Sequence, residues 1–84
     1  IVMYNLIYSE SASKQIKKLD KGVRLRIISS LERIRIRPYP YVKKLVGNSY
    51  FSFRVGDYRI ILDIKEDKLI ILVVEVGHRR NIYQ

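Results

Sequence analysis

Residues 50–76 read YFSFRVGDYRIILDIKEDKLIILVVEV and contain the clearest secondary-structure signal in the chain. From Tyr50 onward, apolar and polar side chains alternate with a period of two, which is typical of a half-buried strand. Two short polar turns, Gly56-Asp57 and Glu66-Asp67, divide the stretch. We therefore predict three strands linked as an antiparallel meander, starting at Tyr50 and continuing over Tyr58–Lys65 and Lys68–Val76, with the last and most apolar strand at the centre of the sheet.

The first half of the chain predicts one strand and two helices. A strand over 3–8 ends at Ser9, in a polar cluster whose side-chain oxygens suit the N-cap of a helix. The apolar residues of this helix recur at helical spacing and are Ala12, Ile16 and Leu19. A second helix begins near Val23, and Pro38 ends it. Residues 39–47 are predicted to form an irregular loop, made basic by Lys43 and Lys44.

The order of these elements predicts an α+β fold. It consists of an N-terminal strand, a helical hairpin and the three-stranded meander, with an antiparallel sheet and the helices packed on one of its faces. The second helix carries arginines on its exposed side, and for these we favour solubility with a modest attraction for RNA or a partner over a specific binding site. They are Arg24, Arg26, Arg33 and Arg35.

The net charge points to a polyanionic partner. The chain has 84 residues, with 17 lysines and arginines against 8 aspartates and glutamates, which gives +9. So short a chain is expected to form one domain, over residues 1–84. Because so large a charge repels itself in a small body, nucleic acid is the first candidate partner, an acidic protein the second and an anionic membrane surface the third.

Cysteine is absent, which excludes disulfides, thiolate metal sites and thiol nucleophiles and suits a reducing cytosol. The longest apolar run, over 69–74, is far too short to cross a bilayer, and the N-terminus lacks the pattern of a signal peptide. We therefore expect a soluble cytoplasmic protein that does not bind membranes. Ile1 and Val2 precede Met3 and are interpreted as residues left from an expression vector.

Two arginines flank the first turn of the meander. Arg54 and Arg59 should lie side by side on neighbouring strands, about 5 Å apart at the backbone. Side-chain alternation places them with Ser52 and Asp63 on the open face, away from the helices. A phosphate would satisfy both guanidinium groups. The alternative is a solvated strand edge at which Arg59 pairs with Asp57 or Asp63.

The C-terminal segment 77–84, GHRRNIYQ, is the densest run of side chains suited to function. Because it follows the central strand, we expect its side chains to reach the open face. His78 either transfers protons or is structural. Tyr83 either buries its ring in the core or stacks on a base while its hydroxyl donates to phosphate.

Metal chemistry has little support in the sequence. Asp63 and Lys65 have the spacing of an acidic-lysine pair in metal nucleases, but two residues are too few for such a site. A lone histidine cannot build a usual zinc site. The chain also has no Gly-rich phosphate loop and no nucleophile elbow. We expect no metal and no cofactor.

Three segments together resemble the RelE/ParE toxin superfamily. They are KLVG at 44–47, FSFRVGDYR at 51–59 and VGHRR at 76–80 followed by Tyr83, and the middle one is the most specific. The resemblance extends over essentially the whole chain. It implies a RelE-like fold and a toxin that enters the ribosomal A site, cleaves messenger RNA and is held inactive by a cognate antitoxin.

The resemblance also implies roles for single residues. Arg59 and Arg79 match the arginines that bind the phosphate and assist the leaving group, and Tyr83 matches the catalytic or stacking tyrosine. Arg54 falls on one of two basic positions in the preceding strand. The other position holds Ser52, where RelE-like members usually have lysine or arginine. The further residues that we expect to bind RNA are Lys43, Lys44, Ser52 and Arg80.

The implied reaction is metal-independent, with the RNA 2′-hydroxyl attacking its own phosphate. Arg54, Arg59 and Arg79 would stabilise the charge of the phosphorane. Since Ser52 replaces a basic residue, proton transfer would fall to His78 or Arg54, although arginine gives up protons poorly.

Two further functions stay open at this point. The first is a ParE-like toxin, which shares the fold but poisons DNA gyrase. The second is an inactive protein that binds nucleic acid or an antitoxin. In either toxin interpretation the antitoxin should be acidic where it contacts this chain, and it should wrap around it as an ordering helix or strand.

Overall fold

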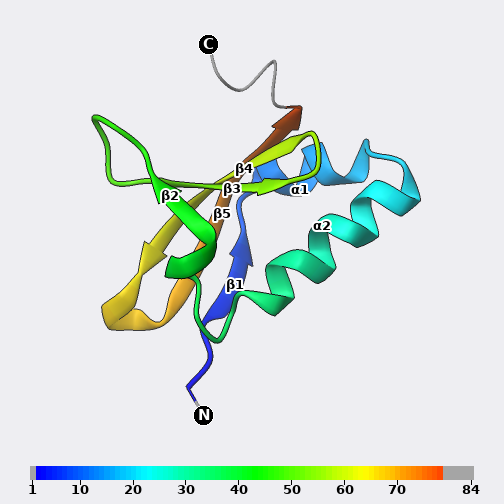
Figure 1. Cartoon of the computed structure of the whole chain (residues 1–84). Helices are drawn as coiled ribbons and strands as arrows, with labels where there is room; N and C mark the ends of the chain where they lie inside the picture. Colours follow the sequence, from blue (N-terminus) through cyan, green and yellow to red (C-terminus); the bar gives the residue numbers. More distant parts are fainter. Residues whose placement is uncertain (1, 79–84) are drawn as a thin grey trace.

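The computed structural model describes residues 2–78 and contains two α-helices on one side of a mixed sheet (Figure 1). The sheet has five strands in the order β1-β5-β4-β3-β2. This architecture confirms the predicted α+β fold, with its N-terminal strand, helical hairpin and meander. The elements are β1 (Asn5–Tyr8), α1 (Glu10–Lys17), α2 (Lys21–Arg33), β2 (Val42–Lys44), β3 (Phe51–Val55), β4 (Tyr58–Lys65) and β5 (Ile70–His78), with 3₁₀ turns at Tyr39–Tyr41 and Glu66–Lys68. No helix in the described range is long and apolar enough to cross a membrane.

The prediction of an entirely antiparallel sheet was wrong, because β1 runs parallel to β5. The register extends from Asn5 opposite Ile70 to Tyr8 opposite Val73. These are the first and last strands, and parallel pairing needs a long connection of this kind rather than a tight turn. The sequence indicates the direction of a strand when a hairpin joins it to its neighbour, and β1 has no such hairpin. The central place predicted for β5 is confirmed, since it lies between β1 and β4.

A short strand also occupies part of the loop that was predicted to be irregular. Residues Val42–Lys44 pair antiparallel with β3, with Lys43 opposite Ser52. The segment follows two prolines and has only three residues, so periodicity gives little warning of it. Its strand conformation comes from the exposed edge of β3, which offers unpaired backbone groups.

One face of the sheet and the inner side of the helices form the hydrophobic core, as the alternation in β3 and β4 predicted. Ile60 and Leu62 are completely buried on this face, as is Ile27 of α2. The other buried apolar side chains of the core are Tyr4, Ala12, Ile16, Leu31, Ile34, Phe53, Val55, Ile71, Val73 and Val76.

A β-bulge interrupts the pairing of β4 with β5. Ile61 lies opposite Glu75 and Leu62 lies opposite Val73, so Val74 is an extra residue in β5. Helix α1 holds the bulge through two side chains. The Ser9 hydroxyl donates to the Val74 carbonyl oxygen at 2.7 Å, and the Val76 amide donates to Gln15 Oε1 at 2.7 Å.

The bulge has a consequence for every residue that follows it in β5. An extra residue reverses the alternation of side chains between the two faces. Before the bulge, Val73 is buried on the helix face, and after it Val76 is buried there. Ser9 has a second role, since its Oγ accepts from the Ala12 amide at 3.0 Å and so confirms the predicted N-cap of α1.

Candidate functional site

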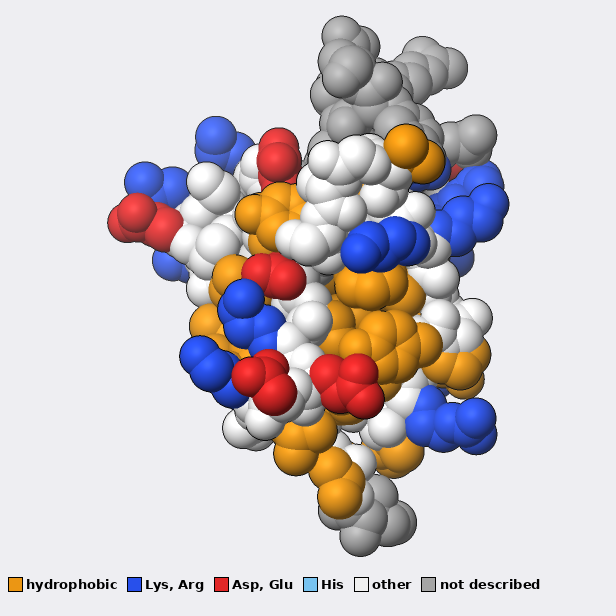
Figure 2. Space-filling model, turned by 90° about the vertical axis from the view of Figure 1, so that its left-hand side faces the viewer, with side chains coloured by type: hydrophobic (Ala, Val, Ile, Leu, Met, Phe, Trp, Pro, Cys, Tyr) orange, Lys and Arg blue, Asp and Glu red, His pale blue; other side chains and the backbone are white. Residues whose placement is uncertain are grey.

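A groove of about 690 Å³ lies on the open face of the sheet, and we call it the sheet groove. It is formed by β2, β3 and β4 together with the turn that precedes β2. Its lining includes five of the residues predicted to act in function, which are Lys43, Lys44, Ser52, Arg54 and Arg59. Pro40, Tyr41, Val42, Leu45 and Val46 complete it. Figure 2 shows this side of the molecule, with an apolar area at its centre and both basic and acidic side chains around it.

The two central arginines lie where the sequence predicted them. Arg54 on β3 is the direct cross-strand partner of Arg59 on β4. Like charges in directly opposed positions destabilise a sheet unless a counter-charge is supplied. Asp63, one of the two acidic residues named as an alternative partner of Arg59, pairs through Oδ2 with Lys65 Nζ at 3.2 Å.

These two arginines differ in burial. The Arg54 side chain is exposed, and its Nε donates to the Gly56 carbonyl oxygen at 3.2 Å. Arg59 is only 7% exposed. Its partner on β5 is Gly77, a residue without a side chain. A buried guanidinium is costly to desolvate, so a buried arginine in the lining of a groove is a candidate for a functional role.

Ser52 lies next to these arginines and is 9% exposed. On one side it faces Lys43 across the β2–β3 pairing, and on the other it faces Ile61. Because directly opposed residues point to the same side of a sheet, Lys43 places a cation immediately beside the serine. Lys44 points the other way, and its Nζ lies 5.3 Å from the centre of the Phe51 ring.

His78 does not join this cluster. It lies opposite Tyr58 at the end of β5, on the helix face, with the two ring centres 5.5 Å apart and the planes at 70°. The expectation that its side chain reaches the open face was wrong, and the bulge at Val74 is the reason. Without that extra residue the alternation would have turned His78 to the face of Arg59. Arg79, Arg80 and Tyr83 lie outside the described residues.

Tyr41 is a groove residue that sequence analysis missed. It is 56% exposed and ends the 3₁₀ turn immediately before β2. An exposed aromatic ring beside a cationic groove suits stacking on a nucleobase. The available signal was an aromatic residue between prolines and lysines, in a segment interpreted only as a basic loop.

Two tyrosines outside the groove have raised pKa values. Burial, together with Tyr4 and Glu66, raises the pKa of Tyr39 from 10.0 to about 12, and its hydroxyl donates to Glu66 Oε1 at 3.4 Å. Burial and the Glu32 carboxylate raise the pKa of Tyr8. Both phenols therefore stay protonated at neutral pH. Within residues 2–78, no three histidine or acidic side chains gather in a way that would hold a metal ion.

Comparison with known proteins places this geometry in a family. Residues 6–83 match the family model described as the ParE toxin of the type II toxin-antitoxin system parDE. A protein of Escherichia coli described as a RelE-like toxin is 30% identical over 79 residues, which cover 90% of this chain and 83% of the relative.

Solved toxin structures have the same fold. The isolated E. coli RelE toxin superposes with a TM-score of 0.78 at 26% identity, over 89% of this chain and 83% of that one. The RelBE2 toxin-antitoxin complex of Mycobacterium tuberculosis gives a TM-score of 0.85 at 22% identity, over 93% of this chain and all of the matched chain. The chain therefore belongs to the ParE toxin family, within the RelE/ParE superfamily, and is the toxin of a type II toxin-antitoxin system.

Proposed function

We propose that this toxin is a ribosome-dependent endoribonuclease that cleaves messenger RNA in the cytoplasm. The observation that carries the proposal is the pairing of Arg54 with Arg59 in the sheet groove, where two positive charges occupy directly opposed positions of β3 and β4. A phosphodiester fits this arrangement, since each guanidinium can donate two parallel hydrogen bonds to phosphate oxygens. The net charge of +9 would draw a polyanion toward the groove.

In the proposed reaction, the 2′-oxygen attacks the adjacent phosphorus and the bond from phosphorus to the 5′-oxygen breaks. Arg54 and Arg59 stabilise the negative charge that builds up on the phosphorane, which is the largest single contribution in catalysis of this kind. Arg79 retains the role implied by the family resemblance and donates a hydrogen bond to the departing 5′-oxygen, which takes up its proton from water. Tyr41 and Tyr83 hold the flanking bases by stacking.

The proton of the 2′-hydroxyl needs an acceptor, and we assign this role to Lys43. Arginine cannot accept the proton because its guanidinium stays protonated, whereas a lysine amine accepts a proton when it is in its neutral form. His78 is on the other face of the sheet, so it cannot replace the basic residue that Ser52 lacks. Lys43 lies directly opposite Ser52 and lines the same groove, which makes it the side chain best placed for the task.

We also propose a cognate antitoxin that covers the sheet groove and is acidic at its contact surface. Several solved structures that share this fold are complexes of a toxin with its antitoxin, such as the intact E. coli RelBE complex. An acidic partner would neutralise the arginine pair and exclude RNA in the same step. A free ribonuclease of this type would otherwise arrest the growth of its host.

The test combines purified protein, ribosomes programmed with a defined message, and mapping of the cut ends. We expect cuts in the ribosomal A site with the unmodified protein. Arg59→Ala should lower the cutting rate by about two to three orders of magnitude, by analogy with the loss of one oxyanion-hole donor. Arg24→Ala is the matched control, since it removes the same charge from α2 outside the sheet groove. Equal cutting by all three proteins, or none by any, would refute the assignment.

Inhibition of DNA gyrase is the second candidate function. The family model that matches residues 6–83 is named for ParE, and Ser52 weakens the similarity to nucleases. A supercoiling assay with purified gyrase separates the two functions. Inhibition of supercoiling without cleavage on the ribosome would establish the gyrase function. RNA binding without either activity would identify an inactive binding protein.

A further inference from the structure

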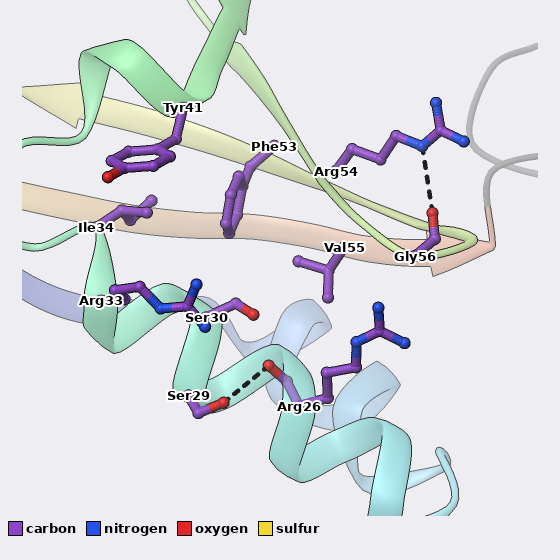
Figure 3. A pocket seen from close by; sticks show the side chains of 10 residues that line it. All are labelled: Arg26, Ser29, Ser30, Arg33, Ile34, Tyr41, Phe53, Arg54, Val55 and Gly56. Atoms are coloured by element: carbon purple, nitrogen blue, oxygen red, sulfur yellow. Dashed lines mark hydrogen bonds between the residues drawn. The ribbon is translucent and has the colours of Figure 1, made fainter.

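A second groove, of about 300 Å³, lies between α2 and the end of β3, and we call it the helix groove (Figure 3). The proposed reaction makes no use of it. Helix α2 forms one wall, and β3 with the following turn forms the other. The lining consists of Arg26, Ser29, Ser30, Arg33, Ile34, Tyr41, Phe53, Arg54, Val55 and Gly56.

Three arginines gather around this groove. Arg26 and Arg33 are seven residues apart on α2, which places them on the same side of the helix about two turns from each other. Arg54 comes from the opposite wall. Both Arg26 and Arg54 approach the same turn residue. Arg26 Nη1 is 3.3 Å from the position that a Cβ on Gly56 would occupy, and Arg54 Nε is 3.2 Å from the Gly56 carbonyl oxygen.

This positive charge has no acidic counterpart in the groove. Among the described residues that line it there is no aspartate or glutamate. The ion pairs formed within residues 2–78 join Arg35 to Glu32 and Lys65 to Asp63, both outside the groove. The Ser30 hydroxyl lies between the two helix arginines and adds a hydrogen-bonding group, while the Ser29 hydroxyl donates to the Arg26 carbonyl oxygen at 3.2 Å (Figure 3). These arginine and serine side chains suit a ligand with several negative charges along its length.

The helix groove adjoins the sheet groove. Arg54 and Tyr41 line both of them. A polymer held by the arginine pair on the sheet would therefore meet the Tyr41 ring at the junction and continue toward Arg33. An exposed ring at the junction favours RNA over an acidic peptide, because every nucleobase has a face that can stack on it.

We propose that the helix groove is a second RNA site, which binds the phosphate backbone of the strand outside the scissile position. The inference rests on the proposed binding of RNA in the sheet groove, and it does not depend on cleavage. It replaces the expectation that the arginines of α2 serve solubility and a modest attraction for RNA or a partner. Arg26 and Arg33 would contact phosphates, and Tyr41 would stack on the base between the two sites.

The test measures binding of 2′-O-methyl oligoribonucleotides, which have no free 2′-hydroxyl and cannot be cut. Fluorescence anisotropy over a series of salt concentrations compares a trinucleotide, which fills one groove, with a dodecamer, which spans both. In the double variant R26Q/R33Q, dodecamer binding should weaken and its salt slope should fall by about 1.4, since each lost single-strand phosphate contact removes roughly 0.7. Trinucleotide binding should stay unchanged.

The control is R24Q/R37Q, which removes the same charge from positions outside both grooves. Thermal melting of both variants checks that they are folded. Equal losses of dodecamer binding in the two variants would overturn the inference, because the effect would then be one of net charge. It would also be overturned if R26Q/R33Q lost binding to a polyglutamate peptide and kept the dodecamer, since the groove would then accept an acidic protein.

Failure of this inference can be told apart from failure of the proposed function. A protein that binds the dodecamer through both grooves but never cuts on the ribosome retains the second RNA site and loses the nuclease assignment. A protein that cuts messages while R26Q/R33Q behaves like its control retains the nuclease and loses the second site.

Discussion

Burial of side chains stabilises the fold on one face of β3 and β4, and it costs free energy on the other. On the helix face, Ile60 and Leu62 have no exposed surface, and transferring them from water stabilises the fold. On the open face, Ser52 and Arg59 are almost as deeply buried, at 9% and 7% exposed, but burial of polar groups costs free energy. Residues adjacent in sequence therefore contribute oppositely to stability. The comparison indicates that the helix face holds the fold, and we propose that the open face carries the chemistry.

The largest effect should come from the helix face. Leu62→Ala should lower the free energy of unfolding by about 2–5 kcal/mol, because it leaves a cavity at a completely buried site. Urea denaturation followed by circular dichroism measures this loss. The matched control is Ile61→Ala, which changes the half-buried neighbour on the open face and should cost less. Equal losses at the two positions would break the distinction between the faces.

The next effect sharpens the role of the open face. Lys43→Ala should reduce the rate of cutting on the ribosome by about 100-fold, the lower end of what general acid-base catalysis contributes, without lowering stability. Ser52→Lys in the same chain should restore much of the rate, because it returns a basic group to the directly opposed position. Lys44→Ala is the control, since its amine lies over Phe51. A rate unaffected by Lys43→Ala would remove this lysine from the mechanism.

A smaller effect should come from the bulge that sets the two faces of β5. Gln15→Ala leaves the Val76 amide without its acceptor, and an unsatisfied buried donor costs about 1–3 kcal/mol. The melting temperature should therefore fall. Gln15→Glu retains an acceptor oxygen at the same distance along the side chain, so it should lower the melting temperature less than Gln15→Ala. If both substitutions leave the protein unchanged, the side chain of α1 does not hold the bulge.

The smallest effect is expected for the ion pair on the open face. Lys65→Ala removes the contact between Lys65 and Asp63. The Lys65 side chain is 45% exposed and the Asp63 side chain is 18% exposed. A solvent-exposed pair of this kind contributes about 0.2–1 kcal/mol, and salt weakens it further. Denaturation at low and high salt measures this contribution. A loss comparable to that of Leu62→Ala would mean that the open face also holds the fold.

Much of the fold follows from local patterns. The period of two in β3 and β4 predicted which side chains form the core, and the turn at Gly56 predicted that Arg54 and Arg59 would be neighbours. The family resemblance could also be recognised from the sequence, because it rests on short runs of adjacent residues. Each of these features is set by residues only a few positions apart, so it can be predicted from the sequence alone.

Other features depend on contacts between distant segments. The direction of β1 and the existence of β2 are set by the strand edges that they meet, at Asn5 opposite Ile70 and at Lys43 opposite Ser52. The α2 arginines similarly gained a possible role only when Arg54 was seen on the opposite wall of their groove.

The sequence by itself determined the class of the fold, the membership of the core and the arginine pair, because alternation and turn chemistry act locally. Only the tertiary structure decided which way His78 faces. Its orientation depends on one extra residue at Val74, held by Ser9 and Gln15 from a helix about sixty positions earlier in the chain. Strict alternation fails at such a bulge, because the hydrogen bonds that stabilise it come from a distant element.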